Sequence, residues 1–247
     1  MAGHSHAANI KHRKGAQDEK KSKIFTKLQR EISSAAKQSG ADAAMNPRLR
    51  LAISKARELN MPKDKIEFAI QRATKDASFD NYEEIRYLIY ISSVAILVET
   101  LSDNKNRTAG EVRAAATKYG GSLGDSGAID FTFSRLGIIQ YKVSEISNFD
   151  DFFEFALQNG ADDIQEEVTE NAEGEQVKIY EIKCEMKVFM SLKTAVEAKY
   201  GDPYFGSLVW IPNTPIAADD ATKERIYKVL DVLEDMDDVQ NAISSME

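Results

Sequence analysis

The stretch DIQEEVTENAEGEQVKIYEIKC, residues 163–184, has the pattern of two paired strands and lies at the centre of residues 136–205. A turn at Asn171–Gly174 separates two runs with strand character, which predicts strands near 163–169 and 176–184. Four more elements are expected around this pair: a strand near 138–143, a helix near 149–158, a helix near 187–199 and a strand near 207–211. The resulting order, βαββαβ, is the ferredoxin-like arrangement.

A second α+β pattern precedes this unit. Apolar residues alternate over Ile85–Ile91, and a β-rich run follows at Val94–Leu101. Both patterns predict strands. The residues Thr108–Glu111 fit a capping box that opens a helix ending at Gly120-Gly121. Alternation over Ile129–Phe133 then predicts another strand, which gives the order ββαβ.

The end of the chain supplies the elements that this second pattern lacks. Apolar residues at helical spacing over Thr222–Glu234 predict a helix, and Val239–Ile243 predicts a final strand. Joined to the earlier elements, they form a discontinuous α+β domain. The ferredoxin-like unit is then an insertion within that domain.

The first 80 residues are helical in pattern. An amphipathic helix is expected from Asp18 to Ser39, and Asn46-Pro47 reads as an N-cap followed by proline at the first helical position. Met61-Pro62 starts a third helix. We therefore predict an α+β fold with three parts: a basic arm and three-helix bundle at 1–79, a discontinuous α+β domain at 80–135 plus 206–247, and an inserted acidic ferredoxin-like domain at 136–205.

Charge is distributed unevenly along the chain. Residues 1–80 hold 17 Lys and Arg against 9 Asp and Glu, a net of +8, whereas the remaining residues hold 15 against 31, a net of −16. A local basic potential attracts a polyanion even when the whole chain is acidic. The lone Cys184 excludes an internal disulfide, and the longest apolar stretch, near 88–98, is too short to span a bilayer. We expect a cytoplasmic protein.

The basic residues of the first part are the leading candidates for contacts with a nucleic acid backbone. The arm has no acid before Asp18, and four cations of the first helix share one face. Such a face is also common on helices that are merely solvated. The candidates are Lys11, His12, Arg13, Lys14, Lys20, Lys21, Lys23, Lys27, Arg30, Arg48 and Arg50, with Lys55 and Arg57 adding charge to the bundle.

The segment Asp103–Thr108 is a second candidate. It joins a predicted strand to a helix N-terminus, where backbone N–H groups and the helix dipole favour anions. Lys105, Asn106 and Arg107 would add charge and hydrogen-bond donors there. The alternative is an ordinary Asn-rich turn that a threonine caps.

Catalytic patterns are missing. The sequence has neither a GxxxxGK[ST] nor a GxGxxG loop, and Cys184 on a predicted strand reads as a small core residue rather than a nucleophile. The histidines His4, His6 and His12 suggest at most weak metal binding, and the carboxylates at 235–238 suit a solvated connection better than a Mg²⁺ site. We therefore predict no enzyme activity, no metal and no cofactor.

Acidic residues are concentrated in the inserted domain. From 143 to 177 there are eleven acids and no Lys or Arg. Such a surface repels phosphates. It is either a solvated face or a mimic that a basic protein partner recognises, and the second alternative would make this protein an acidic adaptor.

The chain resembles the YebC/PmpR family over essentially its whole length. The segments that carry the resemblance are Met1-Ala-Gly-His-Ser, Asn9-Ile-Lys-His-Arg-Lys, Lys23-Ile-Phe-Thr-Lys-Leu, Asn46-Pro-Arg-Leu-Arg-Leu, Asn60-Met-Pro-Lys-Asp, Asp103-Asn-Lys-Asn-Arg-Thr, Gly121-Ser-Leu-Gly, Ile211-Pro-Asn and Asp237-Asp-Val-Gln. The resemblance implies three domains and a cytoplasmic bacterial regulator of transcription that binds DNA. It also implies a link to mitochondrial translational activators of cytochrome c oxidase subunit I and to easing of ribosome stalls at proline runs.

One segment departs from the family. Its members usually carry a Gly-Tyr-Gly-Pro-Gly-Gly loop between the first two strands of the middle domain, where this chain has Ile89-Tyr-Ile-Ser-Ser93. Without glycine, close backbone approach of a partner is disfavoured. A tighter and stiffer hairpin is expected here.

Two functions remain open at this point. The leading one is a monomeric, non-enzymatic DNA-binding regulator of transcription, without a membrane or small-molecule partner. The alternative is a translation factor that binds ribosomal RNA or tRNA on the ribosome. Both use the same basic surface, so charge does not separate them.

Overall fold

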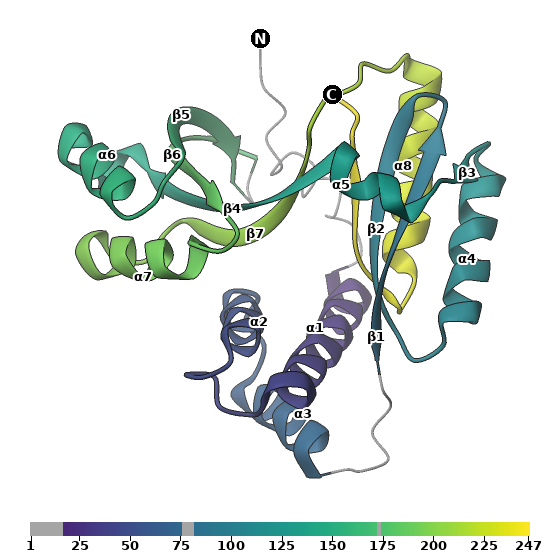
Figure 1. Cartoon of the computed structure of the whole chain (residues 1–247), viewed down its shortest axis with the longest axis horizontal. Helices are drawn as coiled ribbons and strands as arrows, with labels where there is room; N and C mark the ends of the chain where they lie inside the picture. The colour runs from purple at the N-terminus through teal and green to yellow at the C-terminus, as the bar shows by residue number, and fades with distance from the viewer. Residues whose placement is uncertain (1–16, 76–81, 172–173) are drawn as a thin grey trace. The chain divides into compact units, whose positions relative to one another are not determined.

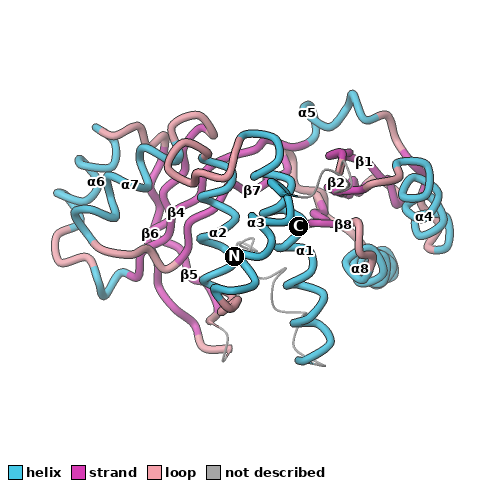
Figure 2. Tube along the Cα trace, turned by 90° about the horizontal axis from the view of Figure 1, so that it is seen from below, coloured by secondary structure: helices cyan, strands magenta, loops and turns pink. Residues whose placement is uncertain are grey.

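The computed structural model describes residues 17–75, 82–171 and 174–247. Figures 1 and 2 show its helices and strands, which follow the expected α+β succession except around residues 126–132. Among the described residues the chain divides into two compact units, one at 133–211 and the other combining 17–132 with 212–247. The second unit thus carries the first as an insertion. The boundaries of the inserted unit lie at 132/133 and 211/212, a few residues outside the expected 136–205.

The inserted unit has the predicted ferredoxin-like topology. Its strand order is β5-β6-β4-β7, and β6 pairs antiparallel with both β4 and β5. Figure 2 shows α6 and α7 together on one side of its strands. The elements are β4 (Phe133–Lys142), α6 (Phe149–Gln158), β5 (Asp163–Glu170), β6 (Gln176–Glu185), α7 (Phe189–Tyr200) and β7 (Phe205–Pro212), with a 3₁₀ turn, η3 (Val143–Glu145), before α6.

Local sequence explains these elements. Asn148 caps α6, since its side-chain oxygen accepts from the backbone N–H groups of Asp150 and Asp151. Gly174, at φ +86°, allows the β5–β6 turn. A side chain at Gly137 would place its Cβ 2.5 Å from the Phe189 ring, so only glycine lets β4 and α7 approach this closely.

The discontinuous α+β domain has the sheet order β3-β1-β2-β8, with antiparallel neighbours. The helices α4 and α8 cover one face, where Ile96 and Val98 of β2 pack with Val112 of α4 and Leu233 of α8. The chain's end therefore completes this sheet, as predicted. The elements are β1 (Glu83–Ile91), β2 (Val94–Ser102), α4 (Lys105–Lys118), β3 (Ser122–Leu123), α8 (Asp220–Asp235) and β8 (Val239–Ser244).

The prediction of a strand over Ile129–Phe133 was wrong. A 3₁₀ turn, η2 (Ser126–Ala128), and a short helix, α5 (Ile129–Thr132), occupy that region, and β4 begins at Phe133. Ile129 is buried while Phe131 is 85% exposed. Three apolar residues are too few to distinguish a period of two from a helical turn.

The predicted start of α4 was also wrong. The N-cap is Asn104, whose side chain accepts from the N–H of Arg107 at 3.1 Å, and the helix begins at Lys105. Thr108, read as the capping residue, is fully buried within the first helical turn. The segment Asp103–Thr108 is therefore mostly the first turn of a helix rather than a loop.

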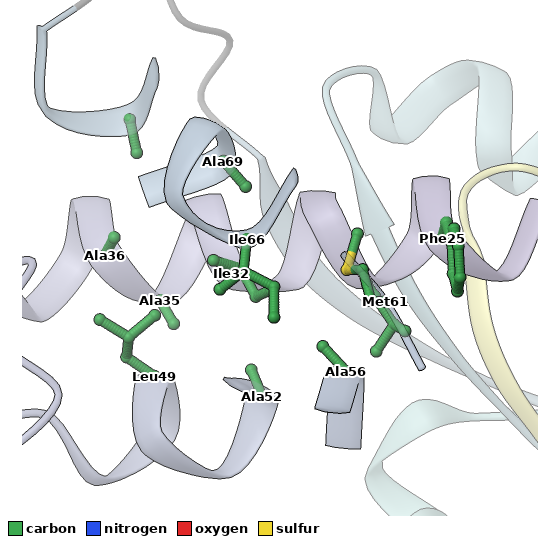
Figure 3. Close-up of a cluster of buried hydrophobic side chains, with 12 residues drawn as sticks. Phe25, Ile32, Ala35, Ala36, Leu49, Ala52, Ala56, Met61, Ile66 and Ala69 are labelled. Atoms are coloured by element: carbon green, nitrogen blue, oxygen red, sulfur yellow. The ribbon is translucent and has the colours of Figure 1, made fainter. Parts of the chain in front are cut away.

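The N-terminal bundle packs around small and aliphatic side chains together with Phe25 and Met61 (Figure 3). Ile32 of α1, Leu49 of α2 and Ile66 of α3 meet at its centre. Asn46 is the predicted N-cap: its oxygen accepts from the N–H of Leu49, and its amide nitrogen donates to the carbonyls of Ala35 and Gly40. The helices are α1 (Gln17–Ser39), α2 (Pro47–Glu58) and α3 (Lys63–Lys75).

The β1–β2 hairpin is tight, as its sequence predicts. Ile91 pairs directly with Val94, so only Ser92 and Ser93 form the turn. Ser92 has φ +55°, in the left-handed region that usually favours glycine. The guanidinium of Arg225 donates to its hydroxyl at 3.2 Å. The turn of this hairpin is therefore made by two serines and contains no glycine.

Candidate nucleic-acid interface

The basic face of α1 lies against the chain's own anionic groups. Lys23, Lys27 and Arg30 are spaced by four and three residues, so they share one face of the helix. That face meets Glu234–Asp238, which we call the α8 C-terminal segment. The contacts are Lys23 Nζ to Asp235 Oδ1 at 3.1 Å, Lys27 Nζ to the Glu234 carbonyl at 2.6 Å, and Arg30 Nη1 to the Asp237 carbonyl at 2.7 Å.

A helix C-terminus attracts cations for two physical reasons. Its last carbonyls have no intrahelical donor, and the helix dipole places partial negative charge there. Lys27 donates to one such carbonyl, that of Glu234, and Arg30 donates to the carbonyl of Asp237, two residues beyond the end of α8. The outer ion pair is weaker, because the side chains of Lys23 and Asp235 remain 45% and 68% exposed.

Asp238 is the centre of this contact. Its side chain is 5% exposed, and its Oδ2 accepts from Ser102 at 3.0 Å, Thr108 at 2.7 Å and Arg107 at 2.7 Å. Its Oδ1 accepts from Arg30 at 3.0 Å. Burial alone would raise the pKa of Asp238, but the hydrogen bonds from Arg107, Thr108 and Ser102 and the charge of Arg107 outweigh burial and lower that pKa. The carboxylate is therefore ionised.

Arg107 is held by two carboxylates instead of pointing freely to solvent. Its Nη2 contacts Asp238 and, at 2.7 Å, Asp103. These hydrogen bonds raise the pKa of Arg107 above its usual value. Lys105 and Asn106 in the same turn are exposed. Of the three residues singled out at this helix N-terminus, one is thus committed to the protein and two face solvent.

Arg48 is also committed to the protein. It forms two hydrogen bonds with Glu31, at 2.8 and 3.0 Å, a third with Gln38 at 2.7 Å, and an ion pair with Glu84. Burial alone would lower the pKa of Arg48, but the hydrogen bonds and charges of Glu31 and Glu84 raise it. This arginine ties α2 to α1 and to β1.

Two other arginines on α2 are exposed to solvent. Arg50 and Arg57 are seven residues apart, so they share a helix face, and both are exposed. Arg50 makes one long hydrogen bond, 3.3 Å to the Ala44 carbonyl. Lys63 and Lys65 at the start of α3 are exposed as well. We call Arg50 and Arg57 the α2 arginine pair.

The structure leaves part of the sequence prediction untested. Lys11, His12, Arg13 and Lys14 lie outside the described residues, as do the side chains of Lys20 and Lys21. The partners of these cations, Asp235 and Asp238, were not predicted from the sequence. The expectation that the carboxylates at 235–238 form a solvated connection is wrong for Asp238, whose side chain is buried.

Charge separates the parts of the molecule. The bundle, residues 17–75, holds 14 Lys and Arg against 7 Asp and Glu, a net of +7. The inserted unit, 133–211, holds 7 against 15, a net of −8. A phosphate backbone is therefore attracted to the first and repelled by the second.

The lone cysteine and the metal-binding side-chain types were two features that the sequence singled out. Cys184 lies on β6 and is fully buried, as expected of a core residue, and burial raises the pKa of its thiol to about 11. Within 17–75, 82–171 and 174–247, no three His, Cys, Asp or Glu side chains are placed to hold a metal ion. The same ranges contain no helix long and apolar enough to cross a membrane.

Comparison with known proteins identifies the class of protein. Residues 5–76 match the family model described as the TACO1/YebC protein N-terminal domain, and residues 82–246 match the one described as the TACO1/YebC second and third domain. The chain therefore belongs to the TACO1/YebC family, whose members are transcriptional-regulator-like proteins or translational activators.

A solved structure supports the same assignment. The crystal structure of a conserved hypothetical protein, Aq1575 from Aquifex aeolicus, aligns with a TM-score of 0.80 and 34% sequence identity. The alignment covers 98% of this chain and 97% of that one. The shared fold thus extends over the bundle and both α+β parts.

Proposed function

We propose that this protein is a non-enzymatic regulator of gene expression that binds nucleic acid through its helical bundle, and that duplex DNA is the partner. The single observation that carries the proposal is the exposed α2 arginine pair on a bundle of net charge +7. Cations that remain exposed are free to neutralise phosphates and release counterions. The basic arm, with Lys11, Arg13 and Lys14, would extend the same contact.

A translation factor that binds ribosomal RNA is the second candidate. Membership in a family that includes translational activators supports it. A folded RNA could contact the bundle and the α4 N-terminus at once. The structure does not favour such a contact, because Arg30 and Arg107 already bind the same carboxylate, Asp238.

The test is the salt dependence of binding, measured with a DNA duplex and with a structured RNA. Arg50→Gln/Arg57→Gln should flatten the slope of log K against log salt by about 2, since each lost phosphate contact removes about 0.9. Lys178→Gln/Lys187→Gln is the matched control, with the same loss of charge on the acidic inserted unit. This control should leave the slope unchanged.

The outcomes separate the candidates. Tighter binding to the duplex with an arginine-dependent slope supports a DNA-binding regulator. An arginine-dependent preference for RNA, with cosedimentation on ribosomes, moves the function to translation. Equal salt slopes for Arg50→Gln/Arg57→Gln and Lys178→Gln/Lys187→Gln would contradict the proposal that the bundle binds the nucleic acid.

A further inference from the structure

We propose that the α8 C-terminal segment, Glu234–Asp238, is an internal competitor of nucleic acid for the basic face of α1. Lys23, Lys27 and Arg30 form a phosphate-binding surface that this segment keeps closed. The inference rests on the proposed function and deepens it, because it adds a second, regulated contact surface to the exposed α2 arginine pair.

The oxygens that bind the α1 basic face are chemically similar to phosphate oxygens. The groups that meet the α1 face are the carboxylates of Asp235 and Asp238 and the carbonyls of Glu234 and Asp237. All are anionic or partly negative oxygens within 2.6–3.1 Å of a Lys or Arg nitrogen. Phosphate oxygens satisfy the same donors with the same geometry. A nucleic acid and the segment therefore compete for one set of cations.

The contact between the α1 basic face and the segment is polar in the part of the chain that the structure describes. The two neighbouring core clusters, one around Ile32 and Leu49 and the other around Ile96 and Leu233, are separate sets of residues. The described contacts of the α1 basic face with the segment are ion pairs and hydrogen bonds. Polar contacts of this kind are modest in strength, and their exposed part weakens with salt.

The two carboxylates of the segment differ in burial. Asp238 is buried in a network with Ser102 and Thr108, so it is fixed to the α+β domain whether or not Arg30 is bound. Asp235 is 68% exposed and contacts only α1 among its described hydrogen bonds and ion pairs. Asp235 is therefore the position at which the contact can be opened without disturbing the fold.

The experiment compares two charge reversals. Asp235→Lys should replace the partner of Lys23 by a repelling charge, open this part of the α1 face, and make the salt slope for duplex DNA steeper by about 1, since a freed cation adds about 0.9. Glu111→Lys is the matched control, because it makes the same charge change on an exposed position of α4. Glu111→Lys should steepen the salt slope less, because it only makes the net charge of the protein more positive.

A further pair of variants shows which cations are responsible. Lys23→Gln/Lys27→Gln should remove the extra slope in the Asp235→Lys background and change the slope little in the wild-type background. Circular dichroism and urea unfolding of Asp235→Lys establish that it is folded, as its exposed position predicts.

The results that would overturn the inference are distinct from a failure of the proposed function. Equal gains from Asp235→Lys and Glu111→Lys would show a general charge effect, and a large loss from Lys23→Gln/Lys27→Gln in the wild type would show a face that is already open. Wild-type protein that binds neither DNA nor RNA in a salt-dependent way would instead contradict the proposed function itself.

Discussion

Two basic faces of the same small bundle differ in what they contact. On α1, Lys23, Lys27 and Arg30 are bound by the α8 C-terminal segment. On α2, Arg50 and Arg57 are exposed. Both faces look alike in the sequence, as rows of cations at helical spacing. Helical spacing of cations is therefore not enough to predict a phosphate contact, because oxygens of the same chain can already bind those cations.

Removing the carboxylate at the centre of the paired face should have the largest effect on stability. Asp238→Asn leaves Arg30 and Arg107 without their shared buried anion. Breaking a buried ion network by deleting one partner costs about 3 kcal/mol, which urea unfolding should detect. The exposed Asp231 is the matched control, and Asp231→Asn should change stability by about 0.5 kcal/mol or less. A similar small loss for Asp238→Asn would contradict its central role.

Acid should weaken the same network. The pKa of Asp238 is lowered in the folded protein, so the unfolded state takes up a proton first as pH falls. The stabilisation from Asp238 is therefore present above about pH 4, the ordinary pKa of aspartate, and is lost as pH falls through the lowered value. In unfolding curves, the gap between wild type and Asp238→Asn should close below about pH 4. A difference in unfolding free energy that stays constant with pH would contradict the lowered pKa of Asp238.

Single arginines on the two faces should separate stability from binding. Arg107→Ala removes a partner of Asp238, so it should lower the urea midpoint and leave the salt slope for nucleic acid unchanged. Arg50→Ala should do the reverse, reducing the slope by about 1 with little effect on the midpoint. A loss of nucleic acid binding in folded Arg107→Ala would instead show that the α4 N-terminus contacts phosphates.

The smallest effect is expected at the exposed edge of the paired face. The ion pair between Lys23 and Asp235 is largely solvated, and exposed pairs contribute about 0.5 kcal/mol. Lys23→Gln should therefore shift the unfolding free energy by about that amount or less. A loss above about 1.5 kcal/mol would mean that this pair is more than a surface contact.

Local signals in the sequence predicted most of the fold. Asn46-Pro47 marked the start of α2, and the succession of strands and helices over the inserted unit gave its ferredoxin-like topology. The failures came where two local patterns competed. Thr108 fits a capping box, but Asn104 also caps, and the buried Asp238 uses the Thr108 hydroxyl.

The candidate site was predicted less completely, for a physical reason. Helical spacing reveals that Lys23, Lys27 and Arg30 share a face. It does not reveal their partners, because Asp235 and Asp238 lie 212 and 208 residues away in sequence, and only the tertiary fold brings them together. The division into 1–79 and 80–135 plus 206–247 stays a prediction, since the bundle and the discontinuous domain lie in one compact unit.

We expect the exposed α2 face to bind nucleic acid while the α1 face is closed. The most direct test compares the salt slopes of two double variants in otherwise wild-type protein, each of which removes two positive charges from the bundle. Arg50→Gln/Arg57→Gln should flatten the slope by about 2, and Lys23→Gln/Lys27→Gln should change it by less than about 0.5. Equal flattening by the two variants, or a larger effect on α1 than on α2, would contradict the account.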